Sequence, residues 1–177
     1  HDTRLGPAIG GCRFLHYEDD RDAIIDALRL ARGMTYKAAL AGLPHGGGKT
    51  VLIRPDKLFD RAAIFRAFGR FIDGLSGRYF TAEDSGTGIE DMEVIRSVTR
   101  QVVGTGGGSG DPSPFTALGV RRGIEACAKI KLNRNDLQDL HVAIQGVGHV
   151  GYHLCQQLHE QGAKLSVADV DPLKAER

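Results

Sequence analysis

The chain has 177 residues, of which 41% are hydrophobic and 25% charged, and this is enough to bury the core of one large domain or two small ones. Its 23 basic and 22 acidic residues nearly cancel, which argues against nucleic acid or an anionic membrane as a partner. Three cysteines without the spacing of a metal site or a disulfide framework favour a reducing compartment, and no stretch reaches the roughly 18 apolar residues of a membrane span. We therefore expect a cytoplasmic protein with no membrane segment and no metal site.

Helical and extended patterns alternate along the first half of the chain. Apolar residues at helical spacing predict a helix over 19–33, which is expected to weaken at its glycine, and a further turn or two over 35–40. The next expected elements are a buried strand at 50–53, a helix at 58–73, a strand at 78–82 and a helix at 89–98. The glycine-rich tract 104–110 is typical of a hinge or linker and indicates a domain boundary.

The rest of the chain has the pattern of a β-α-β unit. A long amphipathic helix is expected to begin near Pro114, because proline in a first helical turn needs no backbone donor. It is followed by a strand at 141–145, a turn and helix at 146–162 and a second strand at 164–168. This order predicts two α/β domains, 1–111 and 112–177, of which the second is the first part of a Rossmann-type dinucleotide-binding domain. Both domains are expected to be incomplete.

A glycine pattern marks the turn of this unit. Gly146, Gly148 and Gly151 have the G-x-G-x-x-G spacing, directly after an apolar strand and at the start of a helix. The first glycine permits the tight turn, the second lets a pyrophosphate approach the backbone, and the third brings helix and strand together. Asp169, at the end of the next strand, can accept hydrogen bonds from ribose hydroxyls and would repel a 2′-phosphate, so the pattern predicts NAD rather than NADP. A glycine turn without a cofactor is the disfavoured interpretation.

The segment Gly46-Gly-Gly-Lys49-Thr50 invites a different interpretation, the phosphate-binding P-loop of a nucleotide hydrolase. That motif needs a glycine at the position of Leu43, whereas Gly42 stands one place out of register. A P-loop also lies between a strand and the helix that binds phosphate, and here a helix precedes the loop and a strand follows it. The P-loop is therefore disfavoured.

Lys37 and Lys49 lie close to this glycine-rich loop in sequence. A helical lysine is usually solvated, so Lys37 alone carries little weight. Two lysines near one pocket, however, lower each other's pKa, and burial lowers it further because both effects disfavour the charged form. One of the two can then act as a neutral base.

Taken together, the motifs resemble the glutamate/leucine/phenylalanine/valine dehydrogenases, and within that family the leucine dehydrogenase branch. The resemblance follows the family's order over nearly the whole chain. It rests on the segments 6–11, 32–37, 46–50, 79–84, 110–114 and 146–148. It implies NAD-dependent oxidative deamination of an L-amino acid to a 2-oxo acid and ammonia, and the reverse reductive amination, in a cleft between two domains of a homo-oligomer.

The resemblance also implies catalytic roles. Lys49 matches the catalytic lysine, Asp84 the catalytic aspartate, and Lys37 the lysine that pairs with the substrate α-carboxylate. The chemistry of oxidative deamination agrees with these roles. The attack of water on an iminium needs a base near neutral pH, which a lysine of lowered pKa supplies, and Asp84 can relay protons to and from the nitrogen. A strand-end turn is the plainer interpretation of Asp84, and Asp111 is a rival carboxylate that can equally cap the following helix.

The remaining residues implied at the site are Gly10, Gly11, Ile9 and Met34 beside the substrate and Thr116 near the nicotinamide. In the glutamate-specific branch a lysine stands at the position of Ile9, so an apolar side-chain pocket is implied. We expect leucine, valine or isoleucine as the small-molecule substrate, with phenylalanine as the alternative. A non-catalytic NAD-binding module is the alternative from another class, and the retained lysines and aspartate argue against it.

Overall fold

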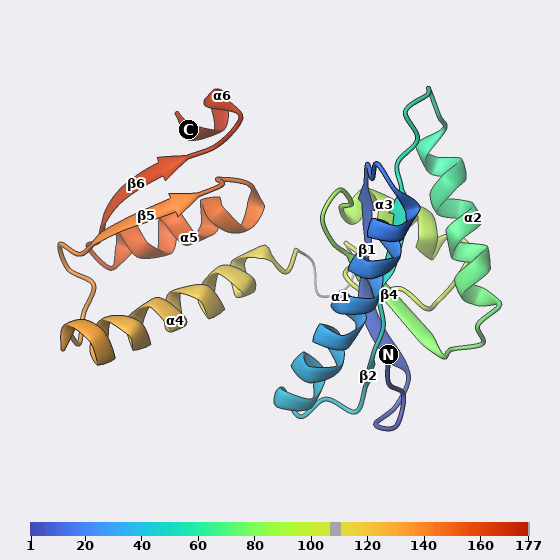
Figure 1. Cartoon of the computed structure of the whole chain (residues 1–177), viewed down its shortest axis with the longest axis horizontal. Helices are drawn as coiled ribbons and strands as arrows, with labels where there is room; N and C mark the ends of the chain where they lie inside the picture. Colours follow the sequence, from blue (N-terminus) through green and yellow to red (C-terminus); the bar gives the residue numbers. More distant parts are fainter. Residues whose placement is uncertain (107–110, 177) are drawn as a thin grey trace. The chain divides into compact units, whose positions relative to one another are not determined.

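The structure, a computed structural model, describes residues 1–106 and 111–176. The chain divides into two compact units, His1–Gly110 and Asp111–Arg177, which Figure 1 colours from blue to green and from yellow to red. The hinge expected in the glycine tract falls largely on residues 107–110, and these lie outside the described residues.

The first unit is an α/β unit built on a parallel sheet. Its elements are β1 (Ala8–Leu15), α1 (Asp20–Leu40), β2 (Gly46–Gly47), β3 (Thr50–Ile53), α2 (Arg61–Asp73), β4 (Tyr79–Glu83) and α3 (Ile89–Arg96). β1 pairs with β2, β3 and β4, all in parallel. Because the same residues of β1 pair with β2 or β3 on one side and with β4 on the other, β1 is the central strand of the sheet.

The hydrophobic pattern does not predict the central strand. β1 contains two adjacent glycines and an arginine in the sequence AIGGCRFL, and glycine is depleted in strands because it offers no side chain to pack. Tertiary packing overrides this low propensity, since Cys12 and Phe14 of β1 are buried in the core. The segment 6–11, expected only as a substrate-side motif, is thus also structural.

α1 is one helix rather than the two pieces expected on either side of Gly33. A glycine inside a helix costs only about 1 kcal/mol relative to alanine, and Ala23, Ala31 and Ala38 are buried along the continuous helix. The helix begins where Asp19 accepts a hydrogen bond from the backbone N–H of Arg21 at 2.8 Å. Packing of the small buried alanines against the sheet therefore outweighs the local weakness at the glycine.

Helices cover both faces of the sheet (Figure 1). The main core cluster combines residues of β1 and β4 with residues of α2 and α3, and its largest fully buried side chains are Phe14, Phe65, Ile72, Met92 and Ile95. Side chains alternate between the faces of a strand, so the neighbours of Phe14 in β1 point to the opposite face. There Arg13 reaches α1 through an ion pair with Asp26.

The second unit contains a parallel β-α-β unit preceded by a long helix (Figure 1). Its elements are α4 (Ser113–Leu132), β5 (His141–Gln145), α5 (His149–Glu160), β6 (Lys164–Ala168) and α6 (Pro172–Ala175). β5 pairs with β6 in parallel, as the predicted order requires. The core of this unit is formed by apolar residues such as Ala117 of α4, Ile144 of β5 and Leu158 of α5.

Across the described residues, no helix combines the length and the apolar character needed to span a membrane.

Candidate active site

Lys49 lies in the segment 46–53, which runs parallel to β1 and keeps the same register along its length. Both β2 and β3 pair with β1 at the same offset. The two residues between them, Gly48 and Lys49, therefore lie level with Gly10 and Gly11 of the central strand. Residues 46–53 thus form one extended segment beside β1, and only residues 48 and 49 of the expected glycine-rich loop lie outside the two strands.

The glycines of this segment are required because neighbouring atoms leave no room for a side chain. A Cβ built on Gly47 would lie 2.1 Å from the backbone nitrogen of Thr35 in α1, and one built on Gly48 would lie 2.8 Å from the ring of Tyr79. On the facing strand, a Cβ built on Gly10 would lie 1.8 Å from the carbonyl oxygen of Gly48. The backbone is thus packed between α1 and β1, and this packing fixes the position of the following lysine.

Lys49 and Asp84 come from opposite sides of β1 and form an ion pair. The Lys49 Nζ atom lies 3.1 Å from Asp84 Oδ1, and the two side chains are 5% and 23% exposed. A Cβ built on Gly11, between them, would approach the carbonyl oxygen of Glu83 to 2.6 Å and Asp84 Cβ to 2.8 Å. The absence of a side chain at Gly11 therefore leaves room for the aspartate beside the central strand.

The turn after β4 holds Asp84 in place. The backbone N–H of Asp84 donates to Thr87 Oγ1 at 2.8 Å, and this hydroxyl lies 3.0 Å from the carbonyl oxygen of Cys12, to which it can donate. Gly86 has a φ of 83° and a Cβ there would lie 2.0 Å from the carbonyl oxygen of Phe14, so only glycine fits. The turn is thereby fastened to the end of β1.

Arg13 also contacts the pair and is not among the residues expected at the site. Its Nε donates to Asp84 Oδ2 at 2.8 Å and an Nη donates to Asp26 Oδ2 at 2.7 Å. The hydroxyl of Tyr17 donates to the same oxygen of Asp26 at 2.6 Å. The available signal was an arginine between Cys12 and Phe14 in an otherwise uncharged strand, since arginine is rarely buried without partners.

The electrostatics of the pair favour an amine that loses its proton readily. Burial lowers the pKa of Lys49 below the 10.5 of a free lysine, Asp84 opposes this shift, and the charges of Arg13 and Lys37 add to it. Burial alone would raise the pKa of Asp84, but the hydrogen bond from Arg13 and the charge of Lys49 outweigh it, so this pKa is lowered. A nearly buried amine beside an ionised carboxylate can accept a proton and pass it on.

The other residues expected beside the substrate come from α1 and β1. Lys37 lies exposed in the last turn of α1, and Met34 is half-buried one turn before it. Ile9 is half-buried in β1, two residues from Gly11 and therefore on the same face of the sheet. Gly10 is buried, and its carbonyl oxygen accepts a hydrogen bond from the Tyr79 hydroxyl at 2.6 Å.

The predicted dinucleotide turn has the backbone geometry that its glycines serve. Gly146 has a φ of 91°, which only glycine adopts readily. A Cβ built on Gly151 would lie 2.0 Å from the carbonyl oxygen of Gly146, whereas one built on Gly148 would meet no atom within 4 Å. Gly151 thus allows helix and turn to pack closely, and the backbone at Gly148, the N-cap of α5, is open to the approach of a phosphate group. These residues fit a dinucleotide.

Asp169 and Thr116 lie in the second unit. The Asp169 carboxylate accepts from the backbone N–H of Val147 at 2.8 Å and from that of Asp171 at 2.9 Å, and these backbone hydrogen bonds lower its pKa. Each carboxylate oxygen keeps a further lone pair for a hydroxyl. Thr116 is exposed in α4, and Asp111, the rival carboxylate, accepts from the N–H of Ser113 at the start of this helix.

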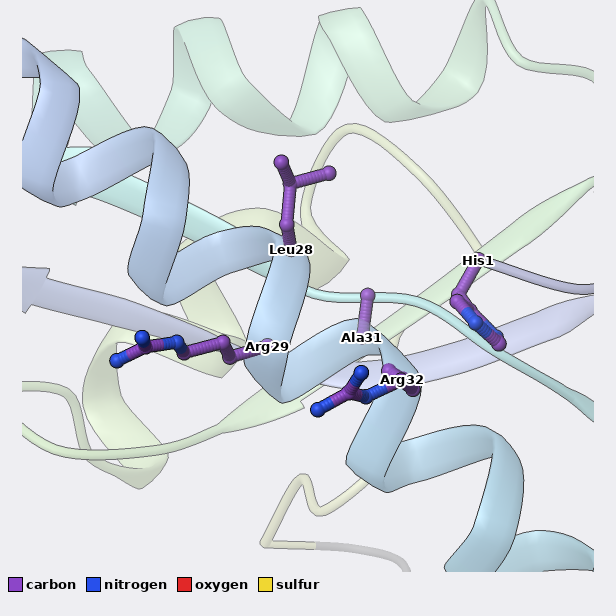
Figure 2. A pocket seen from close by; sticks show the side chains of 5 residues that line it. All are labelled: His1, Leu28, Arg29, Ala31 and Arg32. Carbon is purple, nitrogen blue, oxygen red and sulfur yellow. The ribbon is translucent and has the colours of Figure 1, made fainter.

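A surface pocket beside α1 is separate from these residues. Within the part of the chain that the structure describes, it is lined by His1, Leu28, Arg29, Ala31 and Arg32 (Figure 2), and it shares no residue with the site around Lys49. The described residues also contain no group of three or more histidine, cysteine or carboxylate side chains placed to hold a metal ion.

The chain is similar to known proteins in both sequence and fold. The chain is 56% identical to the leucine dehydrogenase of Geobacillus stearothermophilus over 97% of its own length and 47% of the relative's. The crystal structure of L-tryptophan dehydrogenase from Nostoc punctiforme is matched with 46% identity and a TM-score of 0.68, over 99% of this chain and 49% of the other. For the hetero-hexameric glutamate dehydrogenase of Thermus thermophilus the identity is 26% and the TM-score 0.81, over 96% and 44% of the two chains.

The family assignment follows from matches to both units. Residues 1–101 match the Glu/Leu/Phe/Val dehydrogenase dimerisation domain, and residues 107–172 match the Glutamate/Leucine/Phenylalanine/Valine dehydrogenase domain. The chain spans about half the length of the curated relatives it matches. It belongs to the Glu/Leu/Phe/Val dehydrogenase family.

Proposed function

We propose that the chain is part of an NAD-dependent dehydrogenase that converts an aliphatic L-amino acid to its 2-oxo acid and ammonia, and catalyses the reverse reductive amination. The observation that carries this proposal is the nearly buried amine of Lys49, 3.1 Å from the carboxylate of Asp84. An exposed lysine would stay protonated near neutral pH, whereas burial lowers the pKa of this one. The proposed reaction needs such a base.

The side chains of the first unit have distinct tasks in this reaction. Lys37 binds the α-carboxylate of the amino acid through its charge. Lys49 takes a proton from the water that attacks the iminium carbon, and Asp84 moves protons to and from the departing nitrogen. The pairing of Lys49 with Asp84 lets a proton pass between them, because their polar atoms are within hydrogen-bond distance.

The second unit supplies the cofactor site in this proposal. A bound NAD would supply the acceptor for the hydride that leaves the substrate Cα. The turn at Gly146, Gly148 and Gly151 would hold its pyrophosphate at the N-terminus of α5, and Thr116 would contact the nicotinamide. Asp169 would bind the ribose hydroxyls with the lone pairs left free by its two backbone hydrogen bonds, and its charge would disfavour the 2′-phosphate of NADP.

Leucine, valine or isoleucine is the proposed substrate, because Ile9 offers no charge to a side-chain carboxylate. An aromatic amino acid such as phenylalanine is the second candidate, and the similarity to an L-tryptophan dehydrogenase favours keeping it. We further propose that the whole protein is cytoplasmic and that it is a homo-oligomer. The match to a family dimerisation domain supports the oligomer.

Turnover by the full-length protein tests this function. NADH formation is measured with a panel of aliphatic and aromatic L-amino acids at alkaline pH, and Lys49→Ala is expected to lower kcat/KM by about 10²- to 10⁴-fold while calorimetry finds nearly normal NAD binding. Lys57→Ala, which removes an exposed lysine of the same unit, is the matched control and should be fully active. Absence of NADH formation with every amino acid, or full activity of Lys49→Ala, would refute the proposal; NAD binding without turnover would indicate a binding module.

A further inference from the structure

The ion pair of Lys49 continues through Asp84 and Arg13 to the helix α1. Asp84 uses one carboxylate oxygen for each partner, with Oδ1 3.1 Å from Lys49 Nζ and Oδ2 2.8 Å from Arg13 Nε. Arg13 then donates to Asp26 at 2.7 Å, and Asp26 accepts from Tyr17 at 2.6 Å. Every carboxylate in this series is therefore held by two donors.

The burial of the series shows that it is more than a solvated surface pair. The side chains of Arg13, Asp26 and Asp84 are 20%, 30% and 23% exposed. Exposed ion pairs are screened by salt and contribute little, but partly buried ones keep their orientation and their field. The guanidinium of Arg13 is also planar and bridges its two carboxylates with separate nitrogens, which fixes the direction in which each carboxylate points.

Fold stability alone does not call for an arginine at this place. Well-packed apolar residues often stabilise a partly buried position as well as an ion pair does, or better. Arg13 contacts Asp84, the partner of Lys49, so its position is better explained by a role at the site than by a role in stability. Arg13 Nε contacts Oδ2 and Lys49 Nζ contacts Oδ1, and these two contacts together hold the Asp84 carboxylate in one orientation toward the amine.

We propose that Arg13 is a positioning residue for the amino-acid dehydrogenase reaction proposed above, that it orients Asp84 against Lys49, and that Asp26 in turn orients Arg13. This inference rests on the proposed function for its catalytic meaning. The orientation itself rests on the contacts of the four side chains and can be measured separately.

Among the described residues, the charged and titratable groups that act on Lys49 or Asp84 include Arg13 and Cys12 of β1, Asp26 and Lys37 of α1, and Tyr79 of β4. Burial raises the pKa of Cys12 and of Tyr79 to about 12, so both stay neutral over the working range. The charges of Arg13 and Asp26 act on Lys49 with opposite sign. Removing Arg13 should therefore raise the pKa of Lys49, and removing the charge of Asp26 should lower it.

The experiment compares Arg13→Met, Arg13→Lys and Asp26→Asn in the full-length protein. The protonation of Lys49 is followed by its side-chain ¹³Cε resonance in protein labelled with [¹³C]lysine, and the signal is assigned by its absence in Lys49→Arg. The pH profile of kcat/KM for oxidative deamination is measured on the same proteins. Arg134→Met is the control, because Arg134 also donates to a carboxylate, Asp136 at 3.0 Å, and lies in the second unit.

We expect Arg13→Met to lower kcat/KM by roughly 100-fold, the loss associated with a misplaced reacting group, and to move both the Lys49 titration and the acid limb of the pH profile to higher pH. Arg13→Lys, which keeps the charge, should hold both near the wild-type position, and Asp26→Asn should move both to lower pH. Arg134→Met should move neither. Should Arg13→Met fail to fold, the opposite shift in Asp26→Asn remains a decisive measurement.

Unchanged Lys49 titration in Arg13→Met and Asp26→Asn, or an equal shift in Arg134→Met, would overturn the inference, because a merely structural arginine gives that result. The failure of the proposed function has a different signature. A wild-type protein that forms no NADH from any amino acid refutes the function, while the NMR titration still decides whether Arg13 and Asp26 act on Lys49.

Discussion

The close approach of β1 to the segment before Lys49 makes Gly10→Ala a sharp test of the structure. The added Cβ would lie 1.8 Å from the carbonyl oxygen of Gly48 and 2.7 Å from its carbonyl carbon, whereas real Cβ atoms essentially never come within 3.0 Å of such a neighbour. The obstacle is backbone and cannot rotate away. One of the two segments must therefore move by roughly 1 Å or more.

The expected cost follows from that displacement. Overpacking a well-filled core costs about 1–3 kcal/mol, and a conflict between two backbones belongs at the upper end of this range, near 3 kcal/mol. Because Gly48 immediately precedes Lys49, the same displacement moves the amine relative to Asp84. A shift of about 1 Å in a reacting group can lower the rate by roughly 100-fold, so kcat/KM should fall together with stability.

Gly33→Ala is the matched control for this substitution. Gly33 lies inside α1, where an added Cβ meets no atom within 4 Å, so alanine should stabilise the helix by about 0.5–1 kcal/mol. The free energy of unfolding is measured by urea denaturation at one fixed protein concentration, with kcat/KM determined for the same samples. Wild-type stability and activity in Gly10→Ala would refute the close packing of β1, and an equal loss in Gly33→Ala would show that the steric conflict is not its cause.

Three further outcomes follow from the contacts described above. Asp169→Ser should weaken NAD binding more than NADP binding in fluorescence titrations, because it removes both a ribose acceptor and a charge that repels the 2′-phosphate; an unchanged ratio would exclude that role. The rate of oxidative deamination should rise with pH as Lys49 loses its proton, with a midpoint below 10.5 because burial lowers this pKa, and a midpoint at or above 10.5 would contradict the burial of the amine. Thr87→Val should lower the free energy of unfolding, measured by urea denaturation, by about 1–3 kcal/mol, because the N–H of Asp84 loses its acceptor, and it should lower kcat/KM. Thr87→Ser should keep the wild-type stability and kcat/KM, and equal behaviour of the two variants would mean that the hydroxyl does not hold the turn.

Local pattern was sufficient to predict most of the elements. The β-α-β unit of the second half follows from apolar runs and a glycine turn, and the positive φ of Gly146 is a torsion that its residue type already suggests. The helices of the first unit follow from 3.6-residue periodicity, although α2 begins at Arg61 behind its cap Asp60 and not at 58. Such features depend on neighbours in sequence, and for that reason a single sequence reveals them.

The central strand and the network around Lys49 depend on tertiary structure. β1 carries Gly10 and Gly11, which disfavour a strand locally, and it becomes a strand because parallel neighbours on both sides supply its hydrogen bonds. Sequence resemblance singled out Lys49 and Asp84, but their approach across Gly11, and the bridge from Arg13 to α1, join positions far apart in the chain. Residue types alone determined that a lysine and an aspartate were available, whereas long-range packing decided which oxygen each cation meets, because that choice depends on strand register and on the space left by glycines.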